Sequence, residues 1–365
     1  MRPFSVDVFD RTFVHKYNDM VSTPEYSFDY LAPLESYVTV KVSEIVYIGD
    51  FIFVSNGEYQ FFGIVSGITR LAYNQMEIAY KPFETSFDTT ILFDTNLQGS
   101  PSTKSLEQTL ADYIKAEFKN NSDTLQNISV LRNVTAVTST MSWGFNLKSD
   151  KEGLHTTIVG LYNTLFVRAM QKYGVAVRTV PDLNARKVDI LIGTVQQNQK
   201  TIEADLPSVL SKQITVRATS ASVNKLTVYN AANYVTNRKY YLYTDGTYGD
   251  DPNPLPPKER VTPVINQNRA LETTPGSDFP STADAEAVDF FGSAKYNNLI
   301  ELEVLLDDDL VGPQNIQIGQ AVSVIHDGVS YSSVLTGRQI RNTCKLIFGC
   351  IRLDLTSIIK GGLNG

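Results

Sequence analysis

Ile48-Gly49-Asp50-Phe51-Ile52-Phe53-Val54 is the stretch that decides the fold, because it returns 270 positions later as Ile318-Gly319-Gln320-Ala321-Val322-Ser323-Val324. The segment that follows repeats at the same offset, as Val65-Ser66-Gly67 in the first copy and Leu335-Thr336-Gly337 in the second. Alternating apolar residues in short runs of this kind are typical of β-strands. The repeat therefore predicts two related β-units in one chain.

Each copy holds a turn between these anchors. The first turn contains Asn56-Gly57 and the second His326-Asp327-Gly328, which supply the positive φ that tight hairpins need. Further strand-like segments precede and follow each hairpin; they span 37–42 and 76–80 in the first copy, and 300–305 and 345–348 in the second. The repeated unit is predicted to be a small barrel or sandwich. Chance similarity between two ordinary hairpins is the alternative, since few positions are identical.

Composition indicates a folded protein with several domains. The chain has 365 residues, of which 42% are hydrophobic and 19% charged, and its 19 Tyr and 18 Phe favour β-structure. The net charge of −7 and the scattered Lys and Arg argue against tight binding of nucleic acid. An acidic surface would still suit a conduit through which a polyanion slides without sticking.

No segment predicts secretion through a signal peptide or insertion into a membrane. The first seven residues lack an apolar run, and no later stretch approaches the roughly 18 apolar residues that span a bilayer. Cys344 and Cys350 lie on one predicted strand, roughly 20 Å apart at ~3.3 Å per residue, which is too far for a disulfide. The glycosylation sequons at Asn120, Asn127 and Asn133 are interpreted as chance.

The pattern along the chain predicts four parts. Residues 1–95 form the first β-domain, and 96–184 form an α/β insert with two helices. Ser105 with Gln108 marks the start of one helix, and the other is expected over 156–173, before Gly174.

Strand patterns resume at 185–217, with a short helical turn over 206–210, and are completed by 296–365, so the second β-domain is discontinuous. The inserted 218–295 contains a hairpin (226–229 and 239–243), a Pro-rich loop and a helix over 283–291. The predicted fold class is α+β and β-rich, with two related tube-like β-barrel domains and two mixed inserted domains.

The sequence offers little for catalysis. It contains neither a phosphate-cradling glycine loop nor the His or Cys spacings of zinc sites. The three histidines, His15, His155 and His326, are interpreted as structural or solvated. Ser66 lies in Gly63-Ile64-Val65-Ser66-Gly67, which has the wrong spacing for a nucleophile elbow, and is interpreted as a strand residue.

Acidic clusters are the remaining candidates for chemistry. Asp307-Asp308-Asp309 lacks the spaced ligands of a calcium loop and is interpreted as a solvated turn. Asp245, Asp250 and Asp251 are interpreted as a surface loop. We therefore predict no catalytic residue, no cofactor-binding residue and no metal ligand, and we predict that the protein is not an enzyme.

The domain order resembles the phage baseplate hub family, which includes the hub of contractile-tailed phages and siphophage tail-tip proteins of the tail-associated lysin or prophage endopeptidase type. The residues that carry the resemblance are 37–80, with Ile48-Gly49-Asp50 and Gly63-Ile64-Val65, and their return at Ile318-Gly319 and Leu335-Thr336-Gly337. It covers essentially the whole chain. Relatives often carry a peptidoglycan-degrading or fibre module beyond this point, so the resemblance implies a hub-only member.

The resemblance implies a structural virion protein at the phage tail tip, synthesised in the host cytoplasm. It would form a homotrimer whose six barrels match a sixfold ring of distal tail protein, with other baseplate proteins nearby. Segments 38–42 and 300–306 would bring the barrels together. The inserts would face the host cell surface and open for the tape-measure protein and DNA.

Two other functions remain open from the sequence. One is a cell-wall hydrolase that uses acidic residues or His155 of the inserts. The other is a glycan-binding adhesin that uses exposed tyrosines of the second insert, namely Tyr240, Tyr241, Tyr243 and Tyr248.

Overall fold

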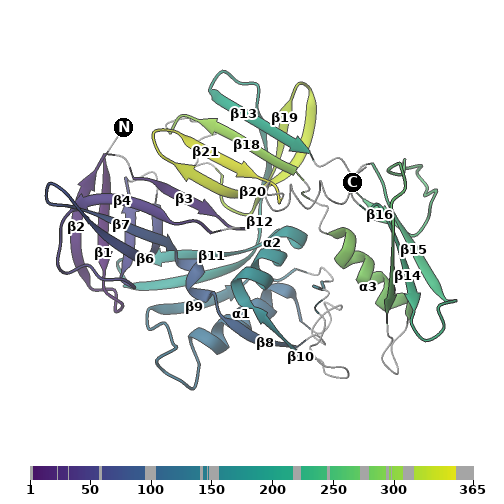
Figure 1. Cartoon of the computed structure of the whole chain (residues 1–365), viewed down its shortest axis with the longest axis horizontal. Coiled ribbons are helices and arrows are strands. Elements are labelled where there is room, and N and C mark those ends of the chain that lie inside the picture. Colours follow the sequence, from purple (N-terminus) through teal and green to yellow (C-terminus); the bar gives the residue numbers. More distant parts are fainter. Residues whose placement is uncertain are drawn as a thin grey trace.

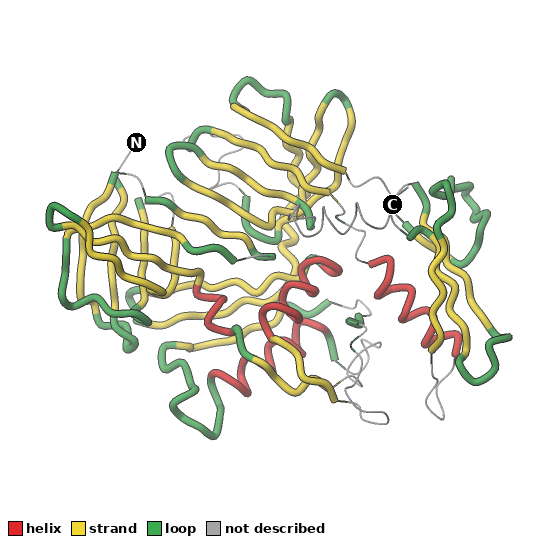
Figure 2. The backbone as a smooth tube through the Cα atoms, in the orientation of Figure 1, coloured by secondary structure: helices red, strands yellow, loops and turns green. Residues whose placement is uncertain are grey.

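The computed structural model describes the larger part of the chain, and its fold is β-rich with a few short helices (Figure 1; Figure 2). The described residues are 3–22, 24–31, 33–56, 60–94, 104–139, 143–145, 147, 156–216, 223–244, 247–271, 279–292, 296, 298–306 and 316–350. Within these ranges, no helix is both long and apolar enough to cross a membrane. The α+β, β-rich class predicted from the sequence is confirmed.

The N-terminal strands form a six-stranded sheet in the order β2-β1-β5-β6-β7-β4. Their bounds are β1 Phe4–Phe9, β2 His15–Val21, β4 Ser36–Lys41, β5 Phe51–Ser55, β6 Gln60–Leu71 and β7 Gln75–Pro82. The sheet curls until its edge strands meet. The Tyr17 hydroxyl donates to the Lys41 carbonyl at 2.8 Å, and the Lys41 N–H donates to the Asp19 carboxylate at 2.8 Å.

A second, larger sheet has the order β11-β12-β19-β20-β21-β18-β13. Its strands are β11 Val175–Asp182, β12 Lys187–Glu203, β13 Val209–Val216, β18 Asn298–Val304, β19 Gln320–His326, β20 Val329–Ile340 and β21 Cys344–Phe348. Buried side chains of both sheets belong to one continuous hydrophobic cluster, to which the first contributes Ile52 and Met76 and the second Leu302 and Val322. The two sheets therefore share a core.

The repeat predicted from the sequence is present in the backbone. Strands β5-β6-β7-β4 and β19-β20-β21-β18 have the same order, and all neighbours in both sets are antiparallel. The pairing of β6 with β7 shifts between Val65 and Gly67, and that of β20 with β21 shifts between Leu335 and Gly337. A bulge conserved at the same offset is not expected of two ordinary hairpins, so the interpretation as chance similarity is wrong.

The turn that enters each hairpin also repeats. Gly49 and Gly319 have φ of 90° and 83°, and their N–H groups donate to the carbonyls of Val65 and Leu335, both at 2.8 Å. The residue after each glycine, Asp50 or Gln320, accepts a hydrogen bond on its side-chain oxygen from the backbone three residues earlier, at 2.8 Å and 2.9 Å. The glycine is required because an L-residue rarely adopts this φ.

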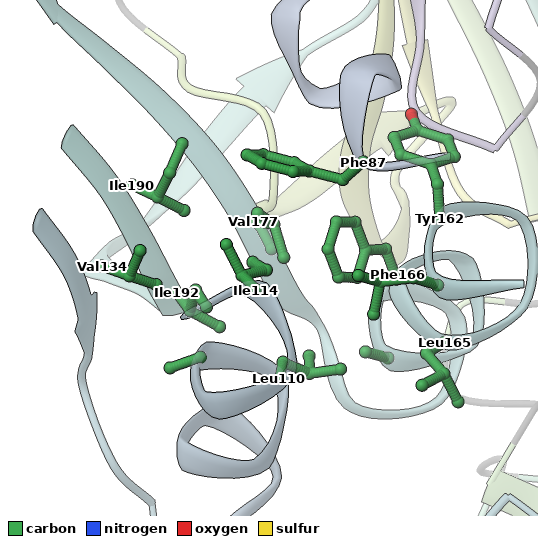
Figure 3. Close-up of a cluster of buried hydrophobic side chains, with 14 of the residues drawn as sticks. Phe87, Leu110, Ile114, Val134, Tyr162, Leu165, Phe166, Val177, Ile190 and Ile192 are labelled. Atoms are coloured by element: carbon green, nitrogen blue, oxygen red, sulfur yellow. The ribbon is translucent and has the colours of Figure 1, made fainter. Parts of the chain in front are cut away.

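A layer of helices and short strands packs against β11 and β12 of the second sheet (Figure 1). It comprises η1 Phe83–Phe87, β8 Thr90–Asp94, α1 Leu106–Phe118, β9 Leu131–Ala136, β10 Thr156–Gly160, the π-helical η3 Leu161–Phe166 and α2 Val167–Tyr173. Figure 3 shows the core of this layer, where Ile114 of α1 and Phe166 of η3 lie with Phe87 beside the strands that carry Val177 and Ile190. Helix α1 begins as predicted, since the Ser105 hydroxyl accepts from the Gln108 N–H at 3.1 Å.

Two local predictions are wrong. The helix expected over 156–173 begins only at Leu161, because Thr156–Gly160 pairs with β8. Four β-branched residues in a row favour the strand, and the available partner strand decides the outcome. The helical turn expected over 206–210 is a tight turn, and Val209 already begins β13. Gly174 does end α2, with φ of 66°.

The remaining segment forms a four-stranded sheet in the order β16-β15-β14-β17, covered on one face by a helix (Figure 1). The elements are β14 Lys225–Asn230, β15 Asn237–Leu242, β16 Tyr248–Gly249, β17 Asn266–Leu271 and α3 Phe279–Gly292. Leu226, Val228 and Leu242 pack with Ala283 and Ala287 of the helix. The hairpin and the helix predicted for this insert are therefore confirmed.

We expect replacement by Ala to destabilise the protein more at Gly319 than at Gly49. In each, replacement by Ala costs about 1–2 kcal/mol of stability through the positive φ. A Cβ at Gly319 would lie 2.8 Å from the Ala176 Cβ, which packing fixes, whereas a Cβ at Gly49 would meet only the flexible end of Arg11. Urea unfolding should therefore show a larger loss for Gly319→Ala than for Gly49→Ala. Equal losses would contradict the close packing at Gly319.

Candidate assembly surfaces of the duplicated sheets

Strand β3, Tyr26–Asp29, joins the two sheets through backbone hydrogen bonding. It precedes β4 in the first sheet, yet it pairs antiparallel with β20 of the second, with Phe28 opposite Arg338 and Tyr26 opposite Ile340. The Tyr30 N–H extends the contact to the Thr336 carbonyl at 2.8 Å. Within one chain, β3 and β20 make the backbone junction between the two sheets. That the segments 38–42 and 300–306 bring the barrels together into a ring of subunits stays a prediction.

A cavity of about 490 Å³ lies beside this junction. It is lined by the first sheet, by β11 and by residues 316–318 before β19, and the side chains of Glu84, Arg178 and Arg338 reach it. The Arg178 guanidinium donates to the Gln317 side-chain oxygen at 3.0 Å, so the turn before β19 is held against β11. Arg338 donates to the Ile316 carbonyl on the other side of that turn.

Burial sets the electrostatics of the cavity. It raises the pKa of the Glu84 carboxyl, whose oxygen also accepts a hydrogen bond from the Thr179 N–H at 2.9 Å. It lowers the pKa of the Arg178 guanidinium. The lining contains one carboxylate, two guanidiniums and no histidine, cysteine or serine. Such a set suits the anchoring of a turn, and its single carboxylate does not provide the carboxylate pair that most glycosidases use.

The two described histidines do not form a common site. His15 contacts Asp7, with 3.1 Å between its Nε2 and the carboxylate. His326 lies at the β19–β20 turn, where its Nδ1 is 2.6 Å from the Asp205 carboxylate and its Nε2 is 3.4 Å from the Asp327 carboxylate. His155 lies outside the described residues. The two described histidines are solvated partners of carboxylates, as expected.

Asp205, His326 and Asp327 come close enough to hold a cation, and the sequence did not predict this grouping. Asp205 follows β12, 121 residues before His326, so spacing along the chain carries no signal. Lys212 already pairs with the Asp205 carboxylate, and with the hydrogen bonds from Asp327 and His326 it holds the pKa of Asp205 well below its usual range. The grouping is best explained as ion pairing that fastens two turns.

The other residues considered for chemistry have structural contacts. Ser66 lies at the bulge of β6, as a strand residue. Asp250 pairs with Arg238 at 2.6 Å, and the Asp251 side chain accepts from the Asn253 N–H at 2.8 Å. Asp245 and Asp307-Asp308-Asp309 lie outside the described residues. Cys344 and Cys350 are both free thiols, as predicted.

The four tyrosines of the inserted sheet do not form an exposed cluster, so that prediction is wrong. Tyr240 and Tyr243 are each only 3% exposed; the first donates to Asp284 and the second to the Asp251 carbonyl. Tyr248 stacks on Phe291, with 5.1 Å between ring centroids. Alternation along β15 places Tyr241 on the face away from α3. The α3 side buries Tyr240 and partly buries Tyr248, whereas the Tyr243 ring lies beside Lys258. The sequence did not indicate which face that helix covers.

Comparison with known proteins places the fold among phage tail proteins. No protein-family model matches the chain, and no curated protein sequence matches it. The 43 kDa tail protein of prophage MuSo2 from Shewanella oneidensis is similar in structure, with a TM-score of 0.55, 12% sequence identity, and coverage of 96% of this chain and 98% of that one. The chain has the fold of a phage tail protein.

A second solved structure supports the same conclusion. The tail protein from Neisseria meningitidis MC58 has a TM-score of 0.56 and 10% identity, and the match covers 95% of this chain and 96% of that one. Both matches extend over the duplicated sheets and over both inserted segments, because they cover nearly the whole of each chain. At this identity the likeness concerns the fold alone.

We expect Glu84→Gln to stabilise the protein at high pH and to leave it unchanged at low pH. Because burial raises its folded-state pKa, Glu84 favours folding only while it is protonated, and this contribution is lost as the pH rises through that pKa. An amide keeps the acceptor for Thr179 without the buried charge. Urea unfolding should show a gain on the order of 1 kcal/mol at pH 8 and none at pH 4.

The matched control is Glu44→Gln. Glu44 is 74% exposed and pairs with Arg70 on the surface, so its replacement should change stability by less than about 0.5 kcal/mol at either pH. A gain for Glu84→Gln that does not depend on pH would show that packing, and not charge, limits this position.

Proposed function

We propose that this chain is a structural virion protein, the subunit of a trimeric baseplate hub that closes the distal end of a phage tail tube. The observation that carries the proposal is the duplicated four-stranded unit, which repeats in strand order, bulge and glycine turn. The near-complete structural match with two phage tail proteins supports it. In this role the protein is located in the virion, at the tail tip, after synthesis in the host cytoplasm.

The duplication matters because of symmetry. A threefold hub that presents two related units per subunit offers six similar contacts, which is what a sixfold ring of distal tail protein would need. In this proposal the tube-like barrels are residues 1–95 and the discontinuous 185–217 with 296–365. The inserts 96–184 and 218–295 project away from the ring, towards other baseplate proteins and the host surface.

The hub would open by movement of domains and not by a chemical step. Opening lets the tape-measure protein and DNA pass, and a rigid-body rearrangement of the inserts is sufficient for this. The net charge of −7 is compatible with a channel that does not retain DNA. The four-stranded sheet with α3 has its own small core and is therefore suited to move as a unit.

We expect negative-stain electron microscopy of the purified protein to show threefold rings with six peripheral densities. Light scattering at high protein concentration should give the mass of three chains. The physical reason is the pair of related units in each subunit, which produces pseudo-sixfold features from three copies. Compact monomers at high concentration, without rings, would overturn the proposal.

A cell-wall hydrolase is the enzymatic alternative, and we expect it to fail. The cavity beside the junction is lined by one carboxylate, Glu84, whereas most glycosidases use a pair. Two of the tyrosines considered for glycan binding are buried. Incubation with purified peptidoglycan should release no soluble fragments, as measured by chromatography against a lysozyme control. Release of fragments would assign the protein an activity in addition to its place in the tail.

A further inference from the structure

The two copies of the repeated unit differ in one backbone edge. In the second sheet, β19 pairs with β20 only up to Val334, and β3 covers the next part of β20, Gly337–Ile340. In the first sheet, β5 pairs with β6 only up to Ile64. The equivalent next part, Gly67–Arg70, pairs with β7 on one side and, among the described strands, with none on the other.

Burial follows the same difference. In β20, next to β3, Thr336 and Ile340 are fully buried. The equivalent residues of β6 are Ser66, which is half-buried, and Arg70, which is exposed. The covered edge and the bare edge therefore occupy the same place in two copies of one fold.

The turn that enters each hairpin shows this difference too. In the second copy, Gln317 is exposed but accepts a hydrogen bond from Arg178, and Ile318 is partly buried against the shared core. Their equivalents in the first copy, Tyr47 and Ile48, are each 61% exposed, and Ile45 nearby is 48% exposed. Tyr47, Ile45 and Ile48 therefore form an exposed apolar patch beside the bare strand edge.

We propose that the edge Gly67–Arg70, together with the turn at Ile45–Ile48, is the docking surface for an extended segment of a second copy of this chain. The docked segment would pair with β6 as β3 pairs with β20. The inference rests on the proposed function, since only a closed ring of subunits requires it. Each subunit covers the edge of its own second unit through β3, so the edge of its first unit is the one left for a neighbour.

A second copy fits this surface for two physical reasons. Bare strand edges bind other strands through unpaired N–H and C=O groups, and natural proteins cover those that they do not use. A heterologous contact that repeats the geometry of an internal junction forms a ring when its rotation closes. The ion pair of Arg70 with Glu44 does not oppose docking strongly, because both side chains are more than two-thirds exposed and such pairs contribute little.

Photo-crosslinking at matched positions tests the proposal. A photoreactive phenylalanine analogue is placed at Thr69 in one full-length variant and at Gln339, the equivalent residue opposite Ser27, in another. After irradiation, the Thr69 variant should give a two-chain species on a denaturing gel. The Gln339 variant should link only within its own chain, to peptides of β3 or β21, as identified by mass spectrometry.

The outcomes separate this inference from the proposed function. If the protein has the mass of a trimer but the Thr69 variant forms no two-chain species, the docking surface is wrong and the trimeric hub stands. If it remains a monomer at high concentration, the hub proposal fails and this inference fails with it. A link from Thr69 to a second chain, in a protein with the mass of a trimer, supports both.

A second measurement tests whether the exposed turn at Ile45–Ile48 contributes to oligomer formation. We expect the double replacement of Tyr47 and Ile48 by Asp to raise, at least tenfold, the protein concentration below which the oligomer dissociates. The reason is that the two Asp side chains place negative charges in the contact. The control is Val235→Asp at the β14–β15 turn, a residue that is 81% exposed and far from the edge in sequence and in sheet. Equal effects of the two variants would overturn the role of the turn.

Discussion

The backbone pairing of β3 with β20 is the constraint on which the rest of this structure depends. A strand that begins in the first unit and hydrogen-bonds to the second fixes the two sheets in register and direction. Tyr30 continues this junction inwards, since its hydroxyl accepts from the Val177 N–H at 3.0 Å and its carbonyl accepts from Tyr162 at 3.1 Å. The two sheets and the helical layer therefore meet around one aromatic side chain.

This junction also explains why polar groups are buried in the cavity beside it. Residues 316–318 approach β11 as an irregular turn. Side chains, rather than backbone pairing between strands, must therefore form the hydrogen bonds of this turn. Arg178 and Arg338 do this from two sides, to Gln317 and to the Ile316 carbonyl. Taking a guanidinium from water is costly unless it is hydrogen-bonded. Both arginines are therefore best understood as positioning groups for the turn.

Local signals predicted much of the fold, and contacts distant in sequence decided the rest. The glycine at positive φ, the Ser105 cap and the Gly174 stop act within a few residues, so the sequence alone reveals them. Whether 156–160 forms a strand depends on β8, more than 60 residues earlier along the chain. The segment Tyr26-Ser27-Phe28-Asp29-Tyr30 alternates as a strand should, yet nothing in it indicates β20 as its partner.

The same limit applies to the candidate assembly surfaces. The repeat identified two equivalent turns, but it could not show that Ile318 packs against the shared core while Ile48 is exposed. A difference between the two units is informative in itself, because in both of them the strand edge beyond the hairpin has N–H and C=O groups that need hydrogen-bond partners. In the second copy, a strand of the same chain, β3, pairs with this edge of β20. Where the other copy retains a bare edge with apolar residues beside it, we infer that another molecule completes the strand pairing.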